Sequence, residues 1–382
     1  MMAGKRIRAG VALCLALLPL LCGRWVAVAH AQASGLPPAV LQVAVGGYWG
    51  LQTLDGQWLY APSFQQMLPY RQGYAVVQRQ GREGYIDTQG RLLTPLAFSL
   101  ATSFQEGLAA VHTDSTSGYV DTTGNWHLPP RYEYAEGFSQ GLAAVYEADH
   151  WGFIDTRGRW VIAPQYMEVL PFQQGRAAVR TESGWGYIDT LGRWVAPPRY
   201  QLALPYAQGI GPVKGGELWG WVDLQGRIVM EPQFVELGRP AEGRVWAMDA
   251  FEQVHYYHTD GQRALADTFS AAGDYHQGWA PLRTDTGWVY ADTSGQLRIP
   301  TEPLEWAAPY ADSMAAVQLG GLWGYMDLAG KVAIPPRYLQ AEAFEAGYAA
   351  VRTQQGWQLI NRQGQPALPG HTYSHPPRVY QP

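Results

Sequence analysis

Short apolar runs alternate with polar turns at a nearly constant interval along the chain. Segments such as Leu142–Val145, Gly152–Asp155 and Arg159–Ile162 are rich in β-branched, aromatic and small apolar side chains. They lack the apolar spacing of a helix, and the Gly and Pro residues between them would break one. Each unit therefore predicts three short β-strands, and we expect the chain to be all-β.

Two glycines mark the interval. The first recurs at a spacing of 34 residues, with 35 at two steps, as Gly56, Gly90, Gly124, Gly158, Gly192, Gly226, Gly261, Gly295, Gly330 and Gly364. The second keeps the same phase as Gly73, Gly107, Gly141, Gly175, Gly209, Gly243, Gly278 and Gly347, with Ser313 at the remaining position. Because both glycines recur with the same period and at a constant distance from each other, we predict about ten tandem units.

A polar turn separates the second and third strands of each unit, as in Asp87–Gly90 and Asp189–Gly192. Its Asp can accept hydrogen bonds from backbone N–H groups, and its Gly can adopt the left-handed conformation that a bulged hairpin requires. The Asp residues lie one per unit, whereas calcium needs at least six oxygens in one place. We therefore interpret the Asp row as turn caps.

The third strand is followed by Pro, as at Pro129-Pro130 and Pro197-Pro198. Because Pro cannot donate to a β-ladder, we expect the strand to end there. The return segment that leads to the next unit is expected to hold one helical turn.

The repeated pattern, x-Gly-x-Ala-x-Val followed by Trp-Gly-Tyr-Ile-Asp-x-x-Gly, resembles the WG-repeat family (WG-containing, or KWG-type, β repeats). The resemblance covers residues from about 40 to 370. Its clearest instances are Trp151-Gly152, Trp185-Gly186, Trp219-Gly220 and Trp323-Gly324. The resemblance implies an interaction or cell-envelope module, in a family whose members share no catalytic residues.

A unit of this size cannot bury its own apolar face, so neighbouring units must stack. We predict an extended or superhelical array of about ten three-stranded units over residues 40–365. A closed β-propeller or toroid is the alternative. The unit at about 243–292 is irregular, because Val254 and His255 replace Trp-Gly, His258 replaces the turn Asp, and Val289 replaces Gly in the following copy.

Residues 1–31 have the features of a secretory signal peptide. A basic start precedes the apolar run Val11–Leu21, and Ala29–Ala31 supplies a small-x-small cleavage site. Residues 32–39 read as a linker and 366–382 as a Pro-rich flexible tail. We expect an exported protein of the periplasm, cell surface or extracellular space, without stable membrane insertion after cleavage.

Loss of the signal changes the composition of the mature chain. Cys14 and Cys22 both leave with it, so no disulfide framework is expected. Cleavage of the signal also removes four of the 27 basic residues, which leaves 23 basic against 32 acidic residues and a net charge of −9. That balance argues against nucleic acid as a partner.

The irregular unit supplies one set of candidate binding residues, namely His255, Tyr257 and His258, with Trp288 in the next copy. Strand alternation places His255 and His258 on opposite faces, so we expect no metal site. An irregular unit is nevertheless where a stacked array can open a pocket.

The second set of candidates comes from the Trp-Gly pairs, which we call the signature. Its tryptophans are Trp151, Trp185, Trp219 and Trp323. They could stack on sugar rings, or they could form a buried ladder between units. The adjacent Gly favours close packing and hence the buried ladder.

The chain shows none of the short catalytic motifs that identify common hydrolases or nucleotide-binding enzymes. We expect a non-enzymatic protein without cofactor or metal, which binds or scaffolds a protein partner or an envelope glycan. One alternative is an envelope-glycan hydrolase with its site in 243–292, and another is a purely structural spacer.

Overall fold

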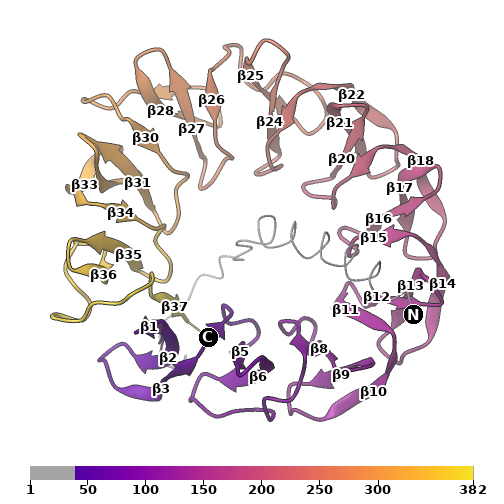
Figure 1. The fold of residues 1–382 in the computed structure, drawn as a ribbon. Helices are drawn as coiled ribbons and strands as arrows, with labels where there is room; N and C mark the ends of the chain where they lie inside the picture. The colour runs from indigo at the N-terminus through magenta and orange to yellow at the C-terminus, as the bar shows by residue number, and fades with distance from the viewer. Residues whose placement is uncertain (1–38, 382) are drawn as a thin grey trace. The chain divides into compact units, whose positions relative to one another are not determined.

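The computed structural model describes residues 39–381, which form ten antiparallel β-sheets arranged around a closed ring (Figure 1). We number these sheets blades 1 to 10 in chain order. The protein is thus a ten-bladed β-propeller, and the prediction of an extended or superhelical array is wrong. The predicted signal peptide, 1–31, lies outside the described residues, as does most of the linker.

Each complete blade has four strands. Figure 1 shows the strand at one edge of the blade, such as β14 (Trp160–Tyr166) or β18 (Trp194–Tyr200), on the outside of the ring, so the strand at the opposite edge of each sheet is its inner strand. In blades 1 to 10 these inner strands are β37 (Arg378–Tyr380), β4 (Gln66–Met67), β7 (Leu100–Ala101), β11 (Tyr134–Ser139), β15 (Glu168–Val169), β19 (Leu202–Ala203), β23 (Glu236–Leu237), β26 (Ala271–Ala272), β30 (Trp306–Ala307) and β34 (Gln340–Ala341). Most of them lie in the return segments, so the helical turn expected there is wrong: the segment pairs with the next blade.

The two middle strands carry most of the buried residues. The first of each pair is β1 (Val40–Val45), β5 (Tyr74–Arg79), β8 (Leu108–His112), β12 (Leu142–Glu147), β16 (Arg176–Thr181), β20 (Ile210–Gly215), β24 (Arg244–Met248), β27 (Trp279–Thr284), β31 (Met314–Leu319) and β35 (Tyr348–Thr353). The second, which carries the signature, is β2 (Tyr48–Thr53), β6 (Arg82–Asp87), β9 (Ser117–Asp121), β13 (His150–Asp155), β17 (Gly184–Asp189), β21 (Leu218–Asp223), β25 (Val254–His258), β28 (Gly287–Asp292), β32 (Leu322–Asp327) and β36 (Gly356–Asn361).

The outer strands are complete in six blades, where each has seven residues. They are β3 (Trp58–Phe64), β10 (Trp126–Tyr132), β14 (Trp160–Tyr166), β18 (Trp194–Tyr200), β22 (Ile228–Phe234) and β33 (Val332–Tyr338), whereas blade 8 has only β29 (Leu297–Arg298). These strands run through their Pro residues, so the prediction that Pro ends them is wrong. An edge strand tolerates Pro because the missing N–H need not pair.

The turn between the signature strand and the outer strand has the predicted chemistry. Asp155 Oδ1 accepts hydrogen bonds from the backbone N of Arg157 and of Arg159, both at 2.9 Å. Gly158 closes the turn with a φ of 73°, a left-handed conformation that glycine adopts without steric cost. The interpretation of the Asp row as turn caps is confirmed.

The signature glycine is required because the outer strand passes directly over it. A Cβ at Gly152 would lie 2.5 Å from the carbonyl O of Ile162 and 2.7 Å from the N of Pro164. A Cβ at Gly220 would lie 2.3 Å from the carbonyl O of Met230. Any side chain at this position would therefore push the outer strand away.

Hydrogen bonds between neighbouring blades repeat around the ring. The Tyr after the signature Gly donates its hydroxyl to a carbonyl of the next inner strand or of the residue after it, as from Tyr119 to Glu136 at 2.9 Å and from Tyr187 to Leu204 at 2.7 Å. The side-chain oxygen of Gln140 accepts a bond from Gly175 N at 2.7 Å. Stacking is thus reinforced by polar contacts that each repeat supplies.

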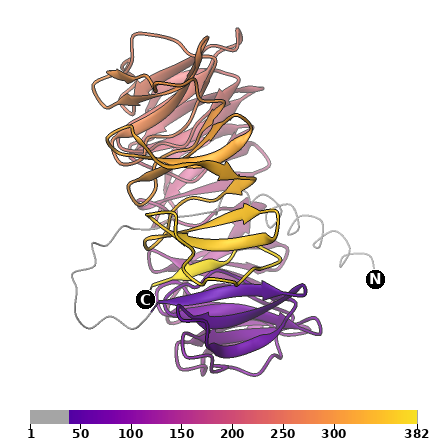
Figure 2. The same cartoon turned by 90° about the vertical axis from the view of Figure 1, so that its left-hand side faces the viewer.

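The C-terminal segment closes the ring, although we expected a flexible tail at 366–382. Strand β37 pairs with β1, and Tyr380 stacks on Tyr70 with ring centroids 4.9 Å apart. The Ser374 hydroxyl donates to the carbonyl of Ala44 at 3.0 Å. Leu368 and Val379 join Leu41 in one buried cluster between the last blade and the first. Figure 2 shows these blades, yellow and indigo, stacked directly on each other.

Candidate functional site

The signature tryptophans lie between the blades rather than on the surface. Trp185 and Trp288 are each 5% exposed. Trp151, Trp219 and Trp323 are half-buried and pack against separate core clusters. The buried-ladder interpretation fits these positions, and an exposed row of binding indoles does not.

His255 links two charged side chains in the irregular blade 7. Its Nε2 lies 2.7 Å from Asp249 Oδ2, and Arg263 donates to its other ring nitrogen. Asp249 Oδ1 also accepts from the backbone N of Phe251 and of Gln253. The imidazole is therefore held by an anion on one side and by a guanidinium on the other.

The remaining candidates of this region do not converge on one pocket. Tyr257 packs against Trp221, with ring centroids 5.8 Å apart, in the cluster between blades 6 and 7. Trp288 belongs to the cluster between blades 8 and 9. His258 occupies the turn, where Asp260 Oδ1 accepts the bond from Gln262 N. Within residues 39–381, no group of three His, Cys, Asp or Glu side chains could hold a metal ion.

Polar residues replace the signature Trp in blades 2 and 3. Glu83 takes one of these positions, and its carboxylate accepts from Ala101 N at 2.7 Å and from Gln78 Nε2 at 3.0 Å. Burial raises the pKa of Glu83. In place of an indole, the carboxylate thus bonds across to the next blade.

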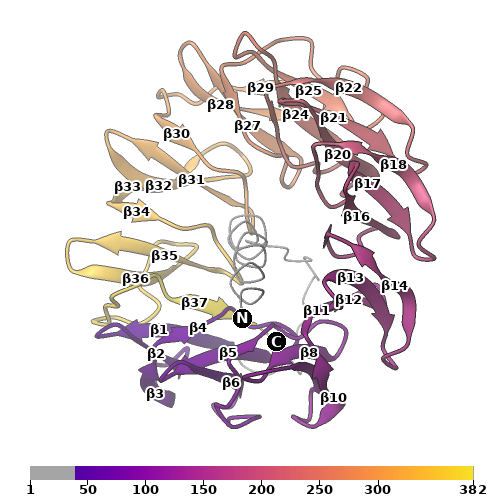
Figure 3. The same ribbon diagram turned by 45° about the vertical axis from the view of Figure 1, so that its right-hand side comes forward.

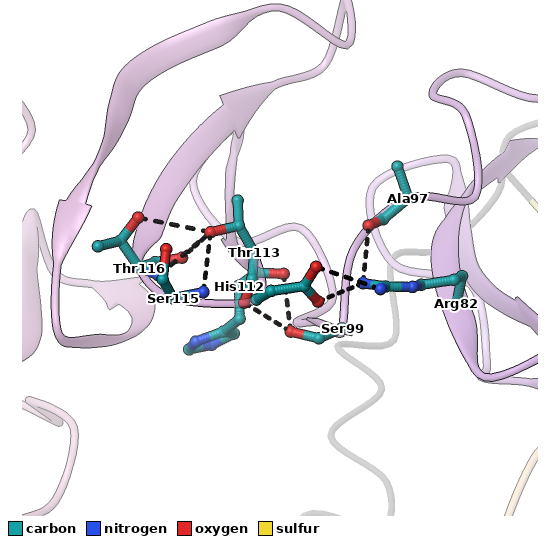
Figure 4. Close-up of polar contacts among 8 residues, drawn as sticks. Arg82, Ala97, Ser99, His112, Thr113, Ser115 and Thr116 are labelled. Carbon is teal, nitrogen blue, oxygen red and sulfur yellow. Dashed lines mark hydrogen bonds and ion pairs between the residues drawn. The ribbon is translucent and has the colours of Figure 1, made fainter.

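Ser117 takes the other position and bonds to His112 Nδ1 at 2.7 Å. Burial lowers the pKa of His112 to about 4, so the imidazole is neutral near pH 7. Figure 4 shows the neighbouring contacts, in which Ser99 donates to the carbonyls of His112 and Thr113. Ser117 is 1% exposed, so this Ser–His pair cannot meet a substrate and acts in packing.

The exposed aromatic residues lie on the outer strands instead. Figure 3 shows β10, β14, β18 and β22 on the outside of the ring. Two residues after the turn Gly, six consecutive blades place a large apolar side chain that is 37–44% exposed. We call these residues the outer belt: Trp58, Leu92, Trp126, Trp160, Trp194 and Ile228 of blades 1 to 6.

Three belt indoles are held by the preceding blade. Trp160 meets the ring of Tyr132 edge-on at 6.5 Å, and Trp194 meets Tyr166 in the same way at 6.2 Å. Trp126 contacts Phe98 at 5.9 Å. Each indole is thus oriented by an aromatic neighbour while it keeps about two fifths of its surface accessible.

Ion pairs flank the belt in four blades. Arg159 Nη2 lies 2.6 Å from Asp155 Oδ2, and Arg193 Nη2 lies 2.7 Å from Asp189 Oδ2. The same pair recurs as Arg91–Asp87 and Arg227–Asp223. Hydrogen bonds from Arg159 lower the pKa of Asp155. In these four blades a large apolar side chain therefore directly follows a locally neutral ion pair in the sequence.

The belt was not among the residues that the sequence singled out. Trp160 stands in the segment that we read as a third strand, but nothing in its pattern distinguishes an outer strand from a covered one. The available signal was the recurrence of Trp two residues after the turn Gly, at 58, 126, 160 and 194.

Two cavities lie at blade 10, which has no complete outer strand. One, of about 460 Å³, is lined by residues that include Arg352, Trp357 and Tyr373. The other, of about 500 Å³, includes Arg337 and Gln358. Gln358 stands where regular blades have the signature Gly.

Several solved structures resemble the chain at low sequence identity. A crystal structure of the eukaryotic initiation factor matches 90% of this chain and 97% of its own, with 11% identity and a TM-score of 0.50. The computationally designed Ika8 protein matches 72% of this chain and 96% of its own, with 12% identity and a TM-score of 0.39. BamB from Moraxella catarrhalis matches 78% and 94%, with 13% identity and a TM-score of 0.32. At these identities the likeness concerns the fold alone.

No curated protein matches the chain. Within residues 39–381, no helix is long and apolar enough to cross a membrane. The family model of the WG containing repeat matches eight segments, residues 49–82, 84–115, 118–148, 151–183, 185–218, 219–249, 288–323 and 323–357. The gap between 249 and 288 falls in the unit that the sequence marked as irregular. With matches over most of its length, the chain belongs to the WG containing repeat family.

Proposed function

We propose that this protein is exported and acts as a non-enzymatic binding or scaffolding protein, with the outer belt as its contact surface. One observation carries the proposal: six consecutive blades expose a large apolar side chain at the same outer position. A large apolar side chain held at the same exposed position in each blade favours binding there, because contact with a partner would remove its apolar surface from water. Four of the six belt residues are Trp, one of the residue types that contribute most to binding interfaces.

The proposal of export draws support from the N-terminal sequence, which has the order of features of a signal peptide. Two carboxylates of the irregular unit are engaged in structural contacts. Asp249 bonds to His255, and Asp274 accepts from Trp246 Nε1 at 2.9 Å and from Arg239 N at 3.0 Å. These contacts favour a structural role for 243–292 over a hydrolase site.

Co-sedimentation with the insoluble cell envelope of the source cells tests the proposal. The mature protein is expected to sediment with it, and the variant W126S/W160S/W194S is expected to remain soluble. A control variant, F251S/I299S, removes two exposed apolar side chains that lie off the belt, at 84% and 73% exposure. If the belt variant and the control sediment alike, the belt is not the contact surface.

A further inference from the structure

Each of blades 1 to 6 adds one side chain to the belt, with Val161 and Leu191, 40% and 65% exposed, as further exposed apolar residues beside it in blades 4 and 5. In blades 1 and 3 to 6 the outer strand begins with its belt residue, and the turn that precedes it carries the polar side chains. In blades 4 and 5 these side chains are the ion-paired Arg159 and Arg193, 68% and 74% exposed. A protein partner favours a continuous apolar centre with a polar rim, which this alternation does not supply.

The outer strands also disfavour an extended peptide as the occupant. A peptide that adds to a sheet edge needs backbone donors and acceptors along that edge. The edge here carries Pro residues in every complete outer strand, such as Pro164 in β14, Pro197 and Pro198 in β18, and Pro232 in β22. Since Pro lacks an N–H, strand addition is blocked at these points.

The charged residues beside the belt further limit the class of ligand that the belt can bind. The four Arg residues that directly precede a belt residue are each paired with the Asp of their own turn, which cancels their charge locally. Arg131 and Arg199 of the outer strands donate instead to the neutral hydroxyls of Tyr132 and Tyr200. A surface built for an acidic polymer would leave most of its cationic groups without such an acidic partner. These pairs still present N–H donors and carboxylate acceptors, which suit uncharged hydroxyl groups.

From this arrangement we infer that the outer belt binds a linear, uncharged polysaccharide, with pyranose rings stacked on successive belt indoles. Such a polymer alternates apolar C–H faces with hydroxyl groups, and blades 4 and 5 likewise place a belt indole next to an ion pair. The edge-on contacts to Tyr132 and Tyr166 fix the indoles in advance, which lowers the entropic cost of binding. The inference rests on the proposed function and adds the chemical class of the partner.

Binding by repeated weak contacts predicts a dependence on chain length. One stacked sugar contributes little, whereas linked sugars gain affinity because later contacts form within the complex. Fully N-acetylated chito-oligosaccharides are suitable probes, since they are linear, uncharged and β-1,4-linked. Calorimetric titration of the mature protein is expected to show an affinity about tenfold higher or more for the longest soluble oligomer than for the dimer.

The variant W126S/W160S/W194S should bind the long oligomer at least about tenfold more weakly. The matched control is Trp306→Ser, which removes an indole of similar exposure, 47%, from an inner strand. It should bind within about twofold of the unmodified protein. A hyaluronan oligosaccharide of equal length, which is acidic, should bind more weakly than the uncharged one.

Three results would overturn the inference: equal affinity for short and long oligomers, equal binding by the belt variant, or preference for the acidic polymer. Absence of oligosaccharide binding, while belt-dependent sedimentation with the envelope persists, would refute the polysaccharide and leave the proposed function standing. Sedimentation that does not depend on the belt would refute the proposed function itself.

Discussion

Blades 3 and 8 have each lost one half of the Trp-Gly signature, and they differ in consequence. Blade 3 keeps Gly118 but has Ser117 in place of Trp, and its outer strand β10 is complete over seven residues. Blade 8 keeps Trp288 but has Val289 in place of Gly, and its outer strand β29 has two residues. The Gly therefore governs the outer strand, and the Trp governs packing between blades.

The other blades agree with this division. All six complete outer strands face a signature Gly, while blades 7 and 10 carry His255 and Gln358 there and have three-stranded sheets. Blade 2 keeps Gly84, yet its outer segment pairs only at its ends, so the Gly is necessary but not sufficient. The belt lies on blades 1 to 6, all of which have the Gly.

Replacement of a signature Trp should have the largest effect. Trp185→Ala removes a buried indole and should lower the free energy of unfolding by about 3–5 kcal/mol. Trp194→Ala, on the belt of the same blade, should cost about 1 kcal/mol, because its side chain is 43% exposed. Urea unfolding of both variants measures the difference, and equal losses would contradict the assignment of the two indoles.

Acid should reveal how blade 3 compensates for its missing Trp. The folded pKa of His112 is lowered from 6.5 to about 4 by burial, so the neutral ring stabilises the fold fully above pH 6.5. That contribution falls as the pH drops toward 4, by about 3 kcal/mol in all. Melting temperature between pH 7 and 4 should fall less in His112→Gln than in the unmodified protein. An identical fall would show that His112 is not buried as a neutral ring.

The contribution of the nearby Glu136 carboxyl to stability changes with pH in the opposite direction. The effect of His112 must therefore be taken from the difference between its variant and the unmodified protein. Burial raises the pKa of Glu136 to about 7. Its contribution to stability is present below the unfolded pKa of about 4.5 and is lost as the pH rises through 7. Glu136→Gln should therefore gain stability relative to the unmodified protein near pH 8, and no gain there would remove this assignment.

A methyl group at the signature Gly tests the role of that residue alone. Gly186→Ala places a Cβ 2.6 Å from the carbonyl O of Ala196 and 2.8 Å from Pro198 N. The displaced outer strand should cost about 1–3 kcal/mol in thermal or urea unfolding. Gly137→Ala is the matched control, because its Cβ would have no neighbour closer than 3.5 Å. Similar losses in the two variants would show that the close approach is unimportant.

The smallest effects are expected at the turns. Asp189 Oδ1 accepts from Leu191 N at 3.0 Å and from Arg193 N at 2.9 Å, so Asp189→Ala should cost about 1 kcal/mol. His258 holds the same position in blade 7, where Asp260 accepts the turn bond. His258→Ala should change stability by less than about 0.5 kcal/mol. A larger loss for His258 in urea unfolding would restore it as a residue of special importance.

The sequence was sufficient for the repeat, the hairpin turns and the irregular unit, because these depend on local chemistry. It could not decide between array and ring, since closure depends on Arg378–Tyr380 pairing with Val40–Gln42 across the whole chain. We predicted a flexible tail because 366–382 is rich in Pro, whereas three of its residues, Arg378–Tyr380, form a strand. The inner strands were missed because most have only two residues and little apolar pattern of their own.

The candidate site was harder to predict for a different reason. Trp185 and Trp194 are nine residues apart in similar apolar runs, yet one is 5% exposed and the other 43%. Their difference arises from the position of their strands in the blade, which no local pattern encodes. Sequence reasoning therefore singled out the signature indoles and passed over those of the outer strand.

Hydroxyl-radical footprinting of the folded protein, read out by mass spectrometry of each Trp-containing peptide, tests this division of the indoles most directly. We predict rapid oxidation of the belt residues Trp58, Trp126, Trp160 and Trp194, and protection of the signature residues Trp185 and Trp288 until the protein unfolds. Oxidation of Trp185 and Trp288 as fast as that of the belt would contradict it, and would return the binding surface to the signature itself.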